Sequence, residues 1–281
     1  MKNILPVLRS ALVIMTPVLF AATGGLFTDL AGMLNIALEG LLLAGAFSAV
    51  VAVYFTGSFA AGLIAAALMS LALSALLAFT TINLRSNVFI TALAANLLAG
   101  GLTIVLSQYF FNTRGVVVIS KALSGVSRGV YVYAGLLLLI AAWIVIYKTP
   151  FGYRLRACDK HSAALVSLGI RPDTYRWAAF LISGFCCGIG GSFLSLNLGA
   201  FVPNMTAGKG WIALVVIFLG SRRPSGLLLA AFVFGLADAF SNYAQGLLSV
   251  PADFILAMPY LLTLLAMVLV SLAEKRKKQA N

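Results

Sequence analysis

The sequence predicts an all-α integral membrane protein with a single transmembrane domain over residues 1–281. Hydrophobic residues make up 62% of the chain and charged residues only 9%, whereas soluble domains contain about 25% charged residues. The apolar runs are continuous, and many approach the roughly 20 residues that a helix needs to cross a bilayer. They lack the alternation typical of a transmembrane barrel, so we expect a polytopic bundle of about 8–10 transmembrane helices.

Nine apolar segments are candidates for membrane-spanning elements. They cover residues 10–28, 30–56, 58–83, 88–111, 130–147, 177–201, 205–221, 224–246 and 254–272. Lys2 and Arg9 precede the first segment as they would in a signal peptide, but no convincing cleavage site follows. We therefore interpret residues 10–28 as the first span.

Basic residues gather between the apolar segments and predict the orientation of the chain. The chain has 19 Lys and Arg against 7 Asp and Glu, which gives a net charge of +12. Because cytoplasmic loops of membrane proteins are rich in Lys and Arg, we expect the interval 148–176, Arg222–Arg223 and the tail 273–281 in the cytoplasm, with both termini there. The basic residues are not interleaved with aromatic ones, which argues against nucleic-acid binding.

The number of crossings draws attention to residues 30–56. If the amino terminus is cytoplasmic and each of the first five segments crosses once, the interval 148–176 becomes external, against its charge. An even number of crossings in 30–56 would remove the conflict, and Gly32, Asn35 and Glu39 favour a broken or re-entrant segment there. The loop 112–129 is then external, and its basic residues fit either an acidic partner or a solvated loop.

The stretch NIALEG, residues 35–40, places the carboxylate of Glu39 in an apolar run. Burying an unpaired charge is very costly. Irregular backbone within a membrane is tolerated where it is buried in protein or lines a cavity. We therefore expect Glu39 in the interior of the bundle, either capping a broken helix or bordering a solute path. Asp238, in the middle of segment 224–246, allows the same two interpretations.

The glycines of segment 177–201 indicate close helix packing. Gly184 and Gly188 form a GxxxG pair, and Gly190 and Gly191 follow within the same segment. Small residues at this spacing let two helix backbones approach each other, so we expect a packing role for them.

The interval FGYRLRACDKHSAALVSLGIRPDTYRW, residues 151–177, contains a short amphipathic helix in our interpretation. Residues 159–168 place Ala163, Ala164, Leu165 and Leu168 on one apolar face, and Gly169 is a typical helix stop. The face is too small for strong membrane binding. Two interpretations follow. The helix docks in the groove of a partner, or the interval is a plain loop that orients the protein by its charge.

Motifs for enzymatic chemistry are missing from the sequence. His161 is the only histidine, and no HExxH motif or Ser-His-Asp arrangement is present. The stretch AGKG at 207–210 lacks the spacing of an ATP-binding P-loop. Cys158, Cys186 and Cys187 lack metal-ligand spacing and are expected to be packing residues. We therefore expect no enzyme, no metal site and no cofactor in this chain, with any energy supplied from elsewhere.

Three stretches in order resemble the permease subunits of ABC importers of the simple-sugar, nucleoside and branched-chain amino-acid type. Residues 151–177 resemble the coupling segment of that family. GLFTDLAGMLNIALEGLLLAGAF, residues 25–47, resembles its amino-terminal signature in the nucleoside-type branch, which includes riboflavin-type relatives. TAGKGWIALVVIFLGSRRPSGLLLAAFVFG, residues 206–235, resembles its carboxy-terminal signature. The resemblance covers residues 25 to about 250.

This resemblance implies a multi-pass subunit of the bacterial cytoplasmic (inner) membrane that forms half of a pore. The other half would be a second permease subunit, which is often a different chain. Two cytoplasmic ATPase subunits would use ATP, and an extracytoplasmic binding protein would deliver the solute. The residues expected at the ATPase-coupling surface are Arg154, Arg156, Asp159, Ala163, Ala164, Leu168 and Gly169.

Polar and aromatic residues inside the apolar segments are candidates for a solute path. Amide groups can donate to and accept from sugar hydroxyls or base edges, and an aromatic ring can stack on a planar ligand. The candidates are Asn35, Glu39, Asn96, Asn197, Asn204 and Trp211. Each amide could instead bond between helices, and Trp211 could anchor the chain at the membrane interface.

The solute and the transport class are left with alternatives. A nucleoside is the first candidate, riboflavin the second and a simple sugar the third, within the same importer architecture. A stand-alone ion-coupled secondary transporter is the alternative of another class, because a broken segment and intramembrane acids such as Asp29, Glu39 and Asp238 also suit such a carrier.

Overall fold

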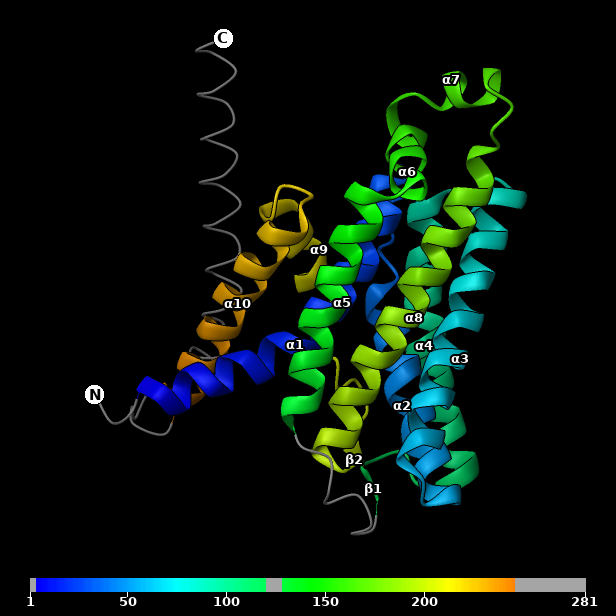
Figure 1. Ribbon diagram of the computed structural model, residues 1–281. Helices are drawn as coiled ribbons and strands as arrows, with labels where there is room; N and C mark the ends of the chain where they lie inside the picture. Colours follow the sequence, from blue (N-terminus) through cyan, green and yellow to red (C-terminus); the bar gives the residue numbers. More distant parts are fainter. Residues whose placement is uncertain (1–3, 120–127, 246–281) are drawn as a thin grey trace.

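A computed structural model describes residues 4–119 and 128–245 and shows a bundle of helices (Figure 1). The elements are α1 (Ile4–Leu30), α2 (Leu38–Thr56), α3 (Phe59–Ala78), the π-helical turn η1 (Phe79–Asn83), α4 (Val88–Phe111), β1 (Val117–Val118), α5 (Arg128–Lys148), α6 (Pro150–Lys160), α7 (Ser162–Ser167), α8 (Pro172–Leu198), β2 (Ala200–Phe201), α9 (Lys209–Leu219) and α10 (Pro224–Gln245). The all-α prediction is confirmed.

Seven helices in the described residues are long and apolar enough to cross a membrane, namely α1 to α5, α8 and α10. The prediction of a full span at 205–221 is wrong. Only 11 residues there are helical, in α9, and at 1.5 Å per residue they extend about 16 Å, roughly half of the hydrocarbon layer. The expected span 254–272 and the basic tail 273–281 lie outside the described residues.

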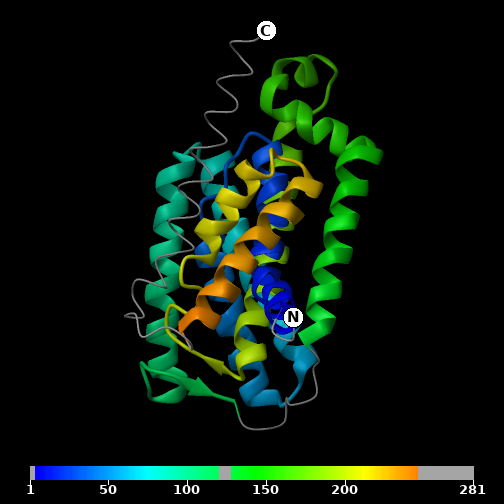
Figure 2. The same ribbon diagram turned by 90° about the vertical axis from the view of Figure 1, so that its left-hand side faces the viewer.

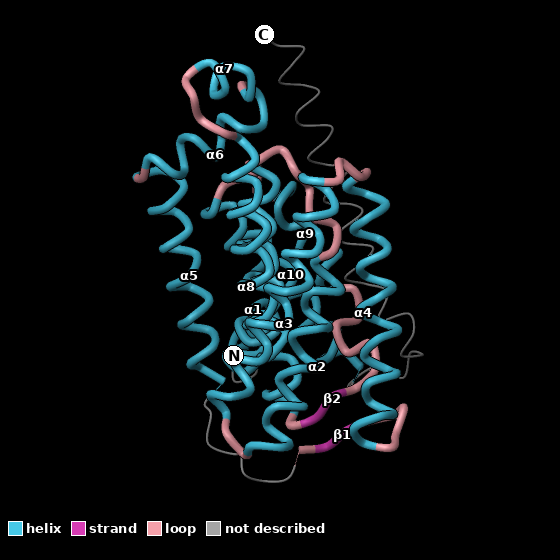
Figure 3. Tube along the Cα trace, turned by 90° about the vertical axis from the view of Figure 1, so that its right-hand side faces the viewer, coloured by secondary structure: helices cyan, strands magenta, loops and turns pink. Residues whose placement is uncertain are grey.

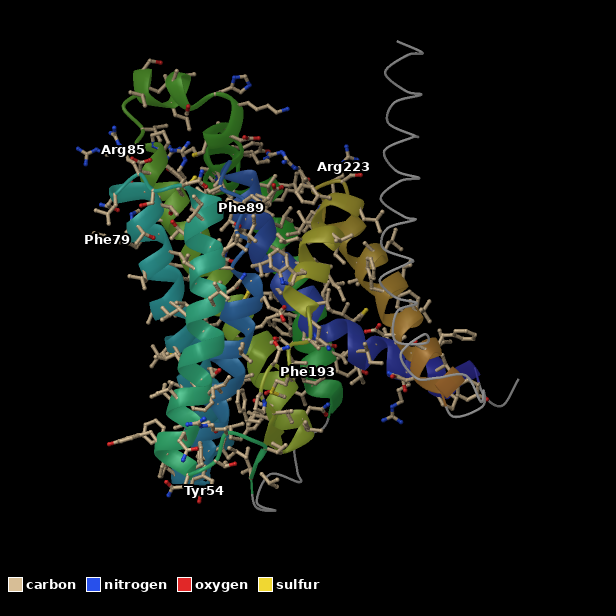
Figure 4. The ribbon with its side chains drawn as sticks, turned by 180° about the vertical axis from the view of Figure 1, so that it is seen from behind. Tyr54, Phe79, Arg85, Phe89, Phe193 and Arg223 are labelled. Atoms are coloured by element: carbon tan, nitrogen blue, oxygen red, sulfur yellow. The ribbon has the colours of Figure 1, made fainter. Side chains whose placement is uncertain are left out.

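The two ends of the bundle differ in charge. One end carries α6 and α7, and Figure 4 shows Arg85 and Arg223 at this same end; we call it the basic end. The opposite end carries the antiparallel pair β1 and β2, with Val117 opposite Phe201 (Figure 3). We call it the strand end. The gathering of Lys and Arg at the basic end is what the positive-inside rule associates with the cytoplasm.

The expected break within residues 30–56 is confirmed, although the expected even number of crossings is wrong. Helix α1 ends at Leu30, residues 31–37 form turns and extended chain, and α2 starts at Leu38. Gly32 lies against Asp159 of α6 at the basic end, whereas Phe47 of α2 packs edge-on against Phe201 at the strand end. The segment therefore traverses the bundle once, and a cytoplasmic amino terminus no longer follows from the count of crossings.

Helix α8 packs in the centre of the bundle through its glycines. A Cβ atom on Gly184 would lie 2.7 Å from the carbonyl oxygen of Ser70 on α3, and one on Gly188 would lie 2.5 Å from that of Ala66. A Cβ atom on Gly191 would overlap the carbonyl oxygen of Leu42 on α2. The packing role expected for these glycines is confirmed, because three helix backbones meet too closely there for any side chain.

Substituting Gly191 by alanine is expected to destabilise the chain by about 1–3 kcal/mol, because the added methyl group overpacks the contact of α8 with α2. The measurement is thermal unfolding of the purified protein in detergent. Gly100→Ala on α4 is the matched control: it brings the same gain in helix propensity, but no atom lies within 4 Å of the position of its Cβ. Equal unfolding temperatures for the two variants would contradict the packing argument.

Candidate functional site

Two part-length helix ends meet inside the bundle. Helix α2 begins after the break and continues to the strand end, while α9 begins after β2 and continues toward the basic end (Figure 1). Their amino-terminal ends touch, because a Cβ atom on Gly210 would overlap the backbone nitrogen of Glu39. Only glycine allows this approach of the two backbones.

The carboxylate of Glu39 joins the two helix ends. One oxygen accepts a hydrogen bond from the backbone N–H of Gly208 at 2.8 Å, and the other accepts one from the N–H of Gly210 at 2.6 Å. Glu39 lies in the first turn of α2 and faces the first turn of α9. Helix amino termini carry partial positive charge and unpaired N–H groups. The half-buried acid is therefore compensated by α9 rather than stranded in an apolar region.

Two asparagines bond further backbone groups at the break. Asn96 of α4 accepts a hydrogen bond from the N–H of Gly40 at 2.7 Å and donates to the carbonyl of Ile36 at 3.0 Å. Asn35 accepts from the N–H of Ala37 and donates to the hydroxyl of Ser183 on α8, both at 3.0 Å. We call the set Asn35, Glu39, Asn96, Gly208 and Gly210 the helix junction.

The other three candidates for the solute path do not belong to the helix junction. Asn197 is exposed near the end of α8. Asn204 is exposed in the loop before α9, with a left-handed backbone at φ 57°. Trp211 on α9 is 42% exposed. The structure therefore brings together three of the six predicted residues and separates the others from them.

Next to the junction, a cavity of about 480 Å³ lies between α1, α8, α9 and α10. Figure 2 views the bundle from the side of α10 and the start of α1. The polar residues of its wall are Asn197, Lys209, Asp238, Ser241 and Asn242, and its apolar residues include Pro17 and Phe193. Lys209 and Asp238 thus place a cationic and an acidic side chain around the same space. We call it the polar cavity; its volume is within the roughly 300–1,000 Å³ of small-molecule sites.

Lys209 connects the polar cavity to the junction and was not among the predicted site residues. It is the residue between Gly208 and Gly210, whose N–H groups bind Glu39. Ser183, the partner of Asn35, was also missed. The sequence contained one signal: a Gly-Lys-Gly turn precedes an apolar stretch that is short for a span.

At the basic end, the interval 148–176 folds into two helices instead of the single helix expected over residues 159–168. Thr149 caps α6 by accepting from the N–H of Gly152, and Pro150 occupies its first turn. Helix α7 ends at Ser167 and is capped by Leu168; Gly169 follows with φ 74°, and the N–H of Ile170 bonds to the carbonyl of Leu165. The expected stop at Gly169 is confirmed, and its geometry is that of a Schellman motif.

The apolar face of α7 differs from the expected one. Leu165 is buried at 6% exposure and anchors the helix, whereas Val166 and Leu168 are 62% and 74% exposed. The predicted coupling residues Ala163, Ala164 and Gly169 are also exposed. The basic end thus presents an apolar surface without a contact partner in the described chain.

Helix α6 carries the other predicted coupling residues. Arg154 donates to the hydroxyl of Tyr175 at 3.0 Å, and the guanidinium of Arg156 lies over the rings of Tyr147 and Tyr153. Asp159 lies 3.7 Å from Arg222, which belongs to the turn between α9 and α10. These contacts fix α6 to the neighbouring helices.

Cys158 of α6 is buried. Burial raises the pKa of its thiol, and the nearby Arg176 opposes that rise. The thiol is therefore protonated at neutral pH, in agreement with the packing role expected for it.

The fold and the site define a class of protein. A multi-pass bundle in which two part-length helices meet, with short helices exposed at its basic end, is an arrangement typical of membrane transport proteins. The family model "Branched-chain amino acid transport system / permease component" matches residues 7–271. The chain belongs to this family of ABC transporter permeases.

Relatives resemble the chain over most of its length. The nucleoside ABC transporter permease protein NupC of Lactococcus lactis is 30% identical, over 94% of this chain and 91% of the relative. The guanosine ABC transporter permease protein NupQ of Bacillus subtilis is also 30% identical, over 93% of this chain and 90% of the relative. TsgC13 of Haloferax volcanii, provisionally named a glucose ABC transporter permease, is 31% identical over 83% of this chain and 75% of its own length.

Solved structures share the fold. The structure of PsaBC from Streptococcus pneumoniae in complex with a Fab matches with a TM-score of 0.56 and 14% identity, over 92% of this chain and 90% of that chain. An inward-facing conformation of a provisionally assigned metal-chelate type ABC transporter matches with a TM-score of 0.57 and 16% identity, over 91% and 84%. At this identity the likeness shows the helix arrangement alone.

Proposed function

We propose that this chain is the permease subunit of an ABC importer for a nucleoside-like solute and forms half of its translocation pore. The observation that carries the proposal is the 30% identity to permeases named for nucleosides and for guanosine, which extends over at least 90% of this chain and of each relative. A simple sugar is the second candidate, favoured by the relative named for glucose. For riboflavin, the relatives named above give no support.

Within this proposal, the polar cavity is part of the solute path and the helix junction supports it. Asn197, Lys209 and Asp238 offer an amide, a cation and a carboxylate around one space, a set of donors and acceptors that suits ribose hydroxyls and base edges. Glu39 and Asn96 use their polar atoms on backbone groups, and Asn35 uses its own on the N–H of Ala37 and the hydroxyl of Ser183. We therefore assign the first group to solute contact and the second to holding the broken helices.

The partners follow from the same architecture. A second permease subunit completes the pore in the bacterial inner membrane. A binding protein delivers the solute at the strand end, and two separate ATPase subunits dock at the basic ends of the two permease subunits. The exposed Val166 and Leu168 of α7 support the last contact, because a helix presenting apolar side chains suits a partner groove. The chain itself binds no cofactor in this scheme. Membership in an ABC permease family argues against the stand-alone carrier.

The test is uptake by the complete transporter. The chain would be reconstituted in liposomes with the ATPase, second permease and binding protein encoded beside it, and offered labelled guanosine, adenosine, uridine, glucose, ribose and riboflavin. We expect ATP-dependent uptake of a nucleoside. Sugar uptake without nucleoside uptake would replace the solute, and uptake that needs no ATPase would refute the importer.

Asn197→Ala is expected to reduce nucleoside uptake at low solute concentration about five- to tenfold, because one hydrogen bond to the solute is worth about 1 kcal/mol. The stability of the chain should be unchanged, since Asn197 is exposed on the cavity wall. Leu198→Ala is the matched control: the neighbouring side chain is 60% exposed and does not belong to the cavity wall. Equal uptake by both variants would remove Asn197 from the path.

A further inference from the structure

Arg222 joins three elements at the basic end. Its Nε lies 2.9 Å from Oδ2 of Asp29 in the last turn of α1, and its Nη1 lies 3.7 Å from Oδ2 of Asp159 on α6. The side chain of Asp29 is only 3% exposed, whereas those of Asp159 and Arg222 are 34% and 45% exposed. The guanidinium therefore lies within ion-pair distance of two carboxylates, and its N–H groups form a rigid planar fork, unlike the single ammonium group of a lysine.

The turn between α9 and α10 holds Arg222 in an unusual backbone conformation. Ser221 and Arg222 both have left-handed φ angles, 53° and 57°. Gly220 and Gly226 make the turn tight, because a Cβ atom on Gly226 would overlap the carbonyl oxygen of Gly220. Consecutive left-handed non-glycine residues persist only where the surroundings determine them. The direction of Arg222 is therefore fixed by the turn and by the acids that it meets.

Helix α9 connects this ion-pair cluster with the helix junction. Its first residues contact Glu39, and its last residue is three positions before Arg222. Val216 and Ile217 on its other face are fully buried, and Ile217 packs against Gly25 of α1. Densely packed protein interiors have low compressibility and transmit strain. A displacement at Arg222 is therefore passed to the Gly208–Gly210 contact with Glu39 and to Lys209 in the polar cavity.

We propose that Arg222 is a positioning residue that links α6, the helix directly before the exposed α7, to α9, so that movement of α6 shifts the helix junction and the polar cavity. This inference rests on the proposed function, because it assumes that α6 and α7 receive the movement of an ATPase. Asp159 supplies the contact from α6, and Asp29 keeps Arg222 in place from α1. The link is ionic and half-exposed, so it can break and re-form during the transport cycle.

The test compares Arg222→Met and Arg223→Met in the complete reconstituted transporter. We expect Arg222→Met to retain assembly and basal ATP hydrolysis, but to transport at least fivefold less solute per ATP hydrolysed. Arg222→Lys, which keeps the charge but loses the fork, should give an intermediate ratio. Arg223→Met is the matched control, because Arg223 is the adjacent exposed arginine and has no ion pair among those recorded in the described chain; its ratio should equal that of wild type.

Two further variants keep the inference falsifiable. Asp159→Asn should lower the ratio when Arg222 is present and have no added effect in Arg222→Met, because both changes break one link. If Arg222→Met fails to fold because Asp29 is left buried without a partner, Asp29→Asn/Arg222→Met removes that charge and should show the same loss of coupling. A folded Arg222 variant with a wild-type ratio would overturn the link, whereas a wild-type complex without ATP-driven uptake would refute the proposed function instead.

Discussion

Replacing Glu39 by alanine is expected to lower the stability of the folded chain by about 3–5 kcal/mol and to abolish transport. The substitution removes two hydrogen bonds to a charged group, each worth about 1.5–3 kcal/mol, and it leaves the N–H groups of Gly208 and Gly210 without their acceptor. It also removes the negative charge that compensates the amino terminus of α9. Thermal unfolding in detergent and uptake in liposomes measure the two effects.

The variants of Glu39 separate a positioning role from solute contact. Glu39→Gln keeps one acceptor oxygen, so we expect about half of the loss in stability. If Glu39 only positions α9, the uptake rate of the folded Gln variant should change less than twofold. A loss beyond tenfold at normal stability would assign Glu39 to the solute path. Asp173→Ala is the matched control, because Asp173 is also an acid in a first helical turn but its side chain is 62% exposed.

The helix junction shows which part of the site a single sequence can predict. Glycines, Asn35 and a carboxylate in one apolar run indicate broken helix geometry, because each is costly in an unbroken span. The partners of Glu39 lie 169 and 171 positions away. They are backbone N–H groups, which every residue except proline possesses, so no side-chain pattern marks them. The position of the break was therefore predictable, and its partners were not.

The apolar segments predicted the fold for a simple reason, and α9 is where that reason fails. Hydropathy reports how apolar the side chains of a segment are, and those of α9 are apolar because the helix is buried among α1, α2 and α10. It does not report whether the segment begins at the membrane surface or at mid-depth. The segment 205–221 therefore had the composition of a span, although residues before Lys209 form the turns that lead to the junction.

The amides illustrate the same limit for function. Asn96 and Asn197 are both asparagines in apolar helices, and both were candidates for solute contact. In the structure, Asn96 is occupied by the backbone of α2, while Asn197 faces the polar cavity. An amide is satisfied equally well by a carbonyl, an N–H group or a ligand, so only its position in space separates the two roles.

Leu168→Asp is expected to weaken binding of the ATPase subunit at least tenfold without destabilising the permease. Leu168 is 74% exposed on α7, so its replacement removes no contact that holds the chain together. Burying a leucine side chain at an interface contributes about 1.5–3 kcal/mol, or roughly one to two orders of magnitude in affinity, and a carboxylate placed in an apolar groove would oppose docking further. Co-purification of the ATPase and thermal unfolding of the permease measure the two quantities.

The control for this prediction uses the neighbouring position. Ser167→Asp adds the same charge to α7 but removes no apolar side chain, and Ser167 is exposed and bonds only locally to the carbonyl of Ala164. If the added charge alone disturbed the basic end, both variants would lose the ATPase equally, and the apolar surface of α7 would not be the docking site. A selective loss in Leu168→Asp, with the unfolding temperature unchanged, would mean that Leu165 holds α7 on the bundle while Leu168 binds the partner.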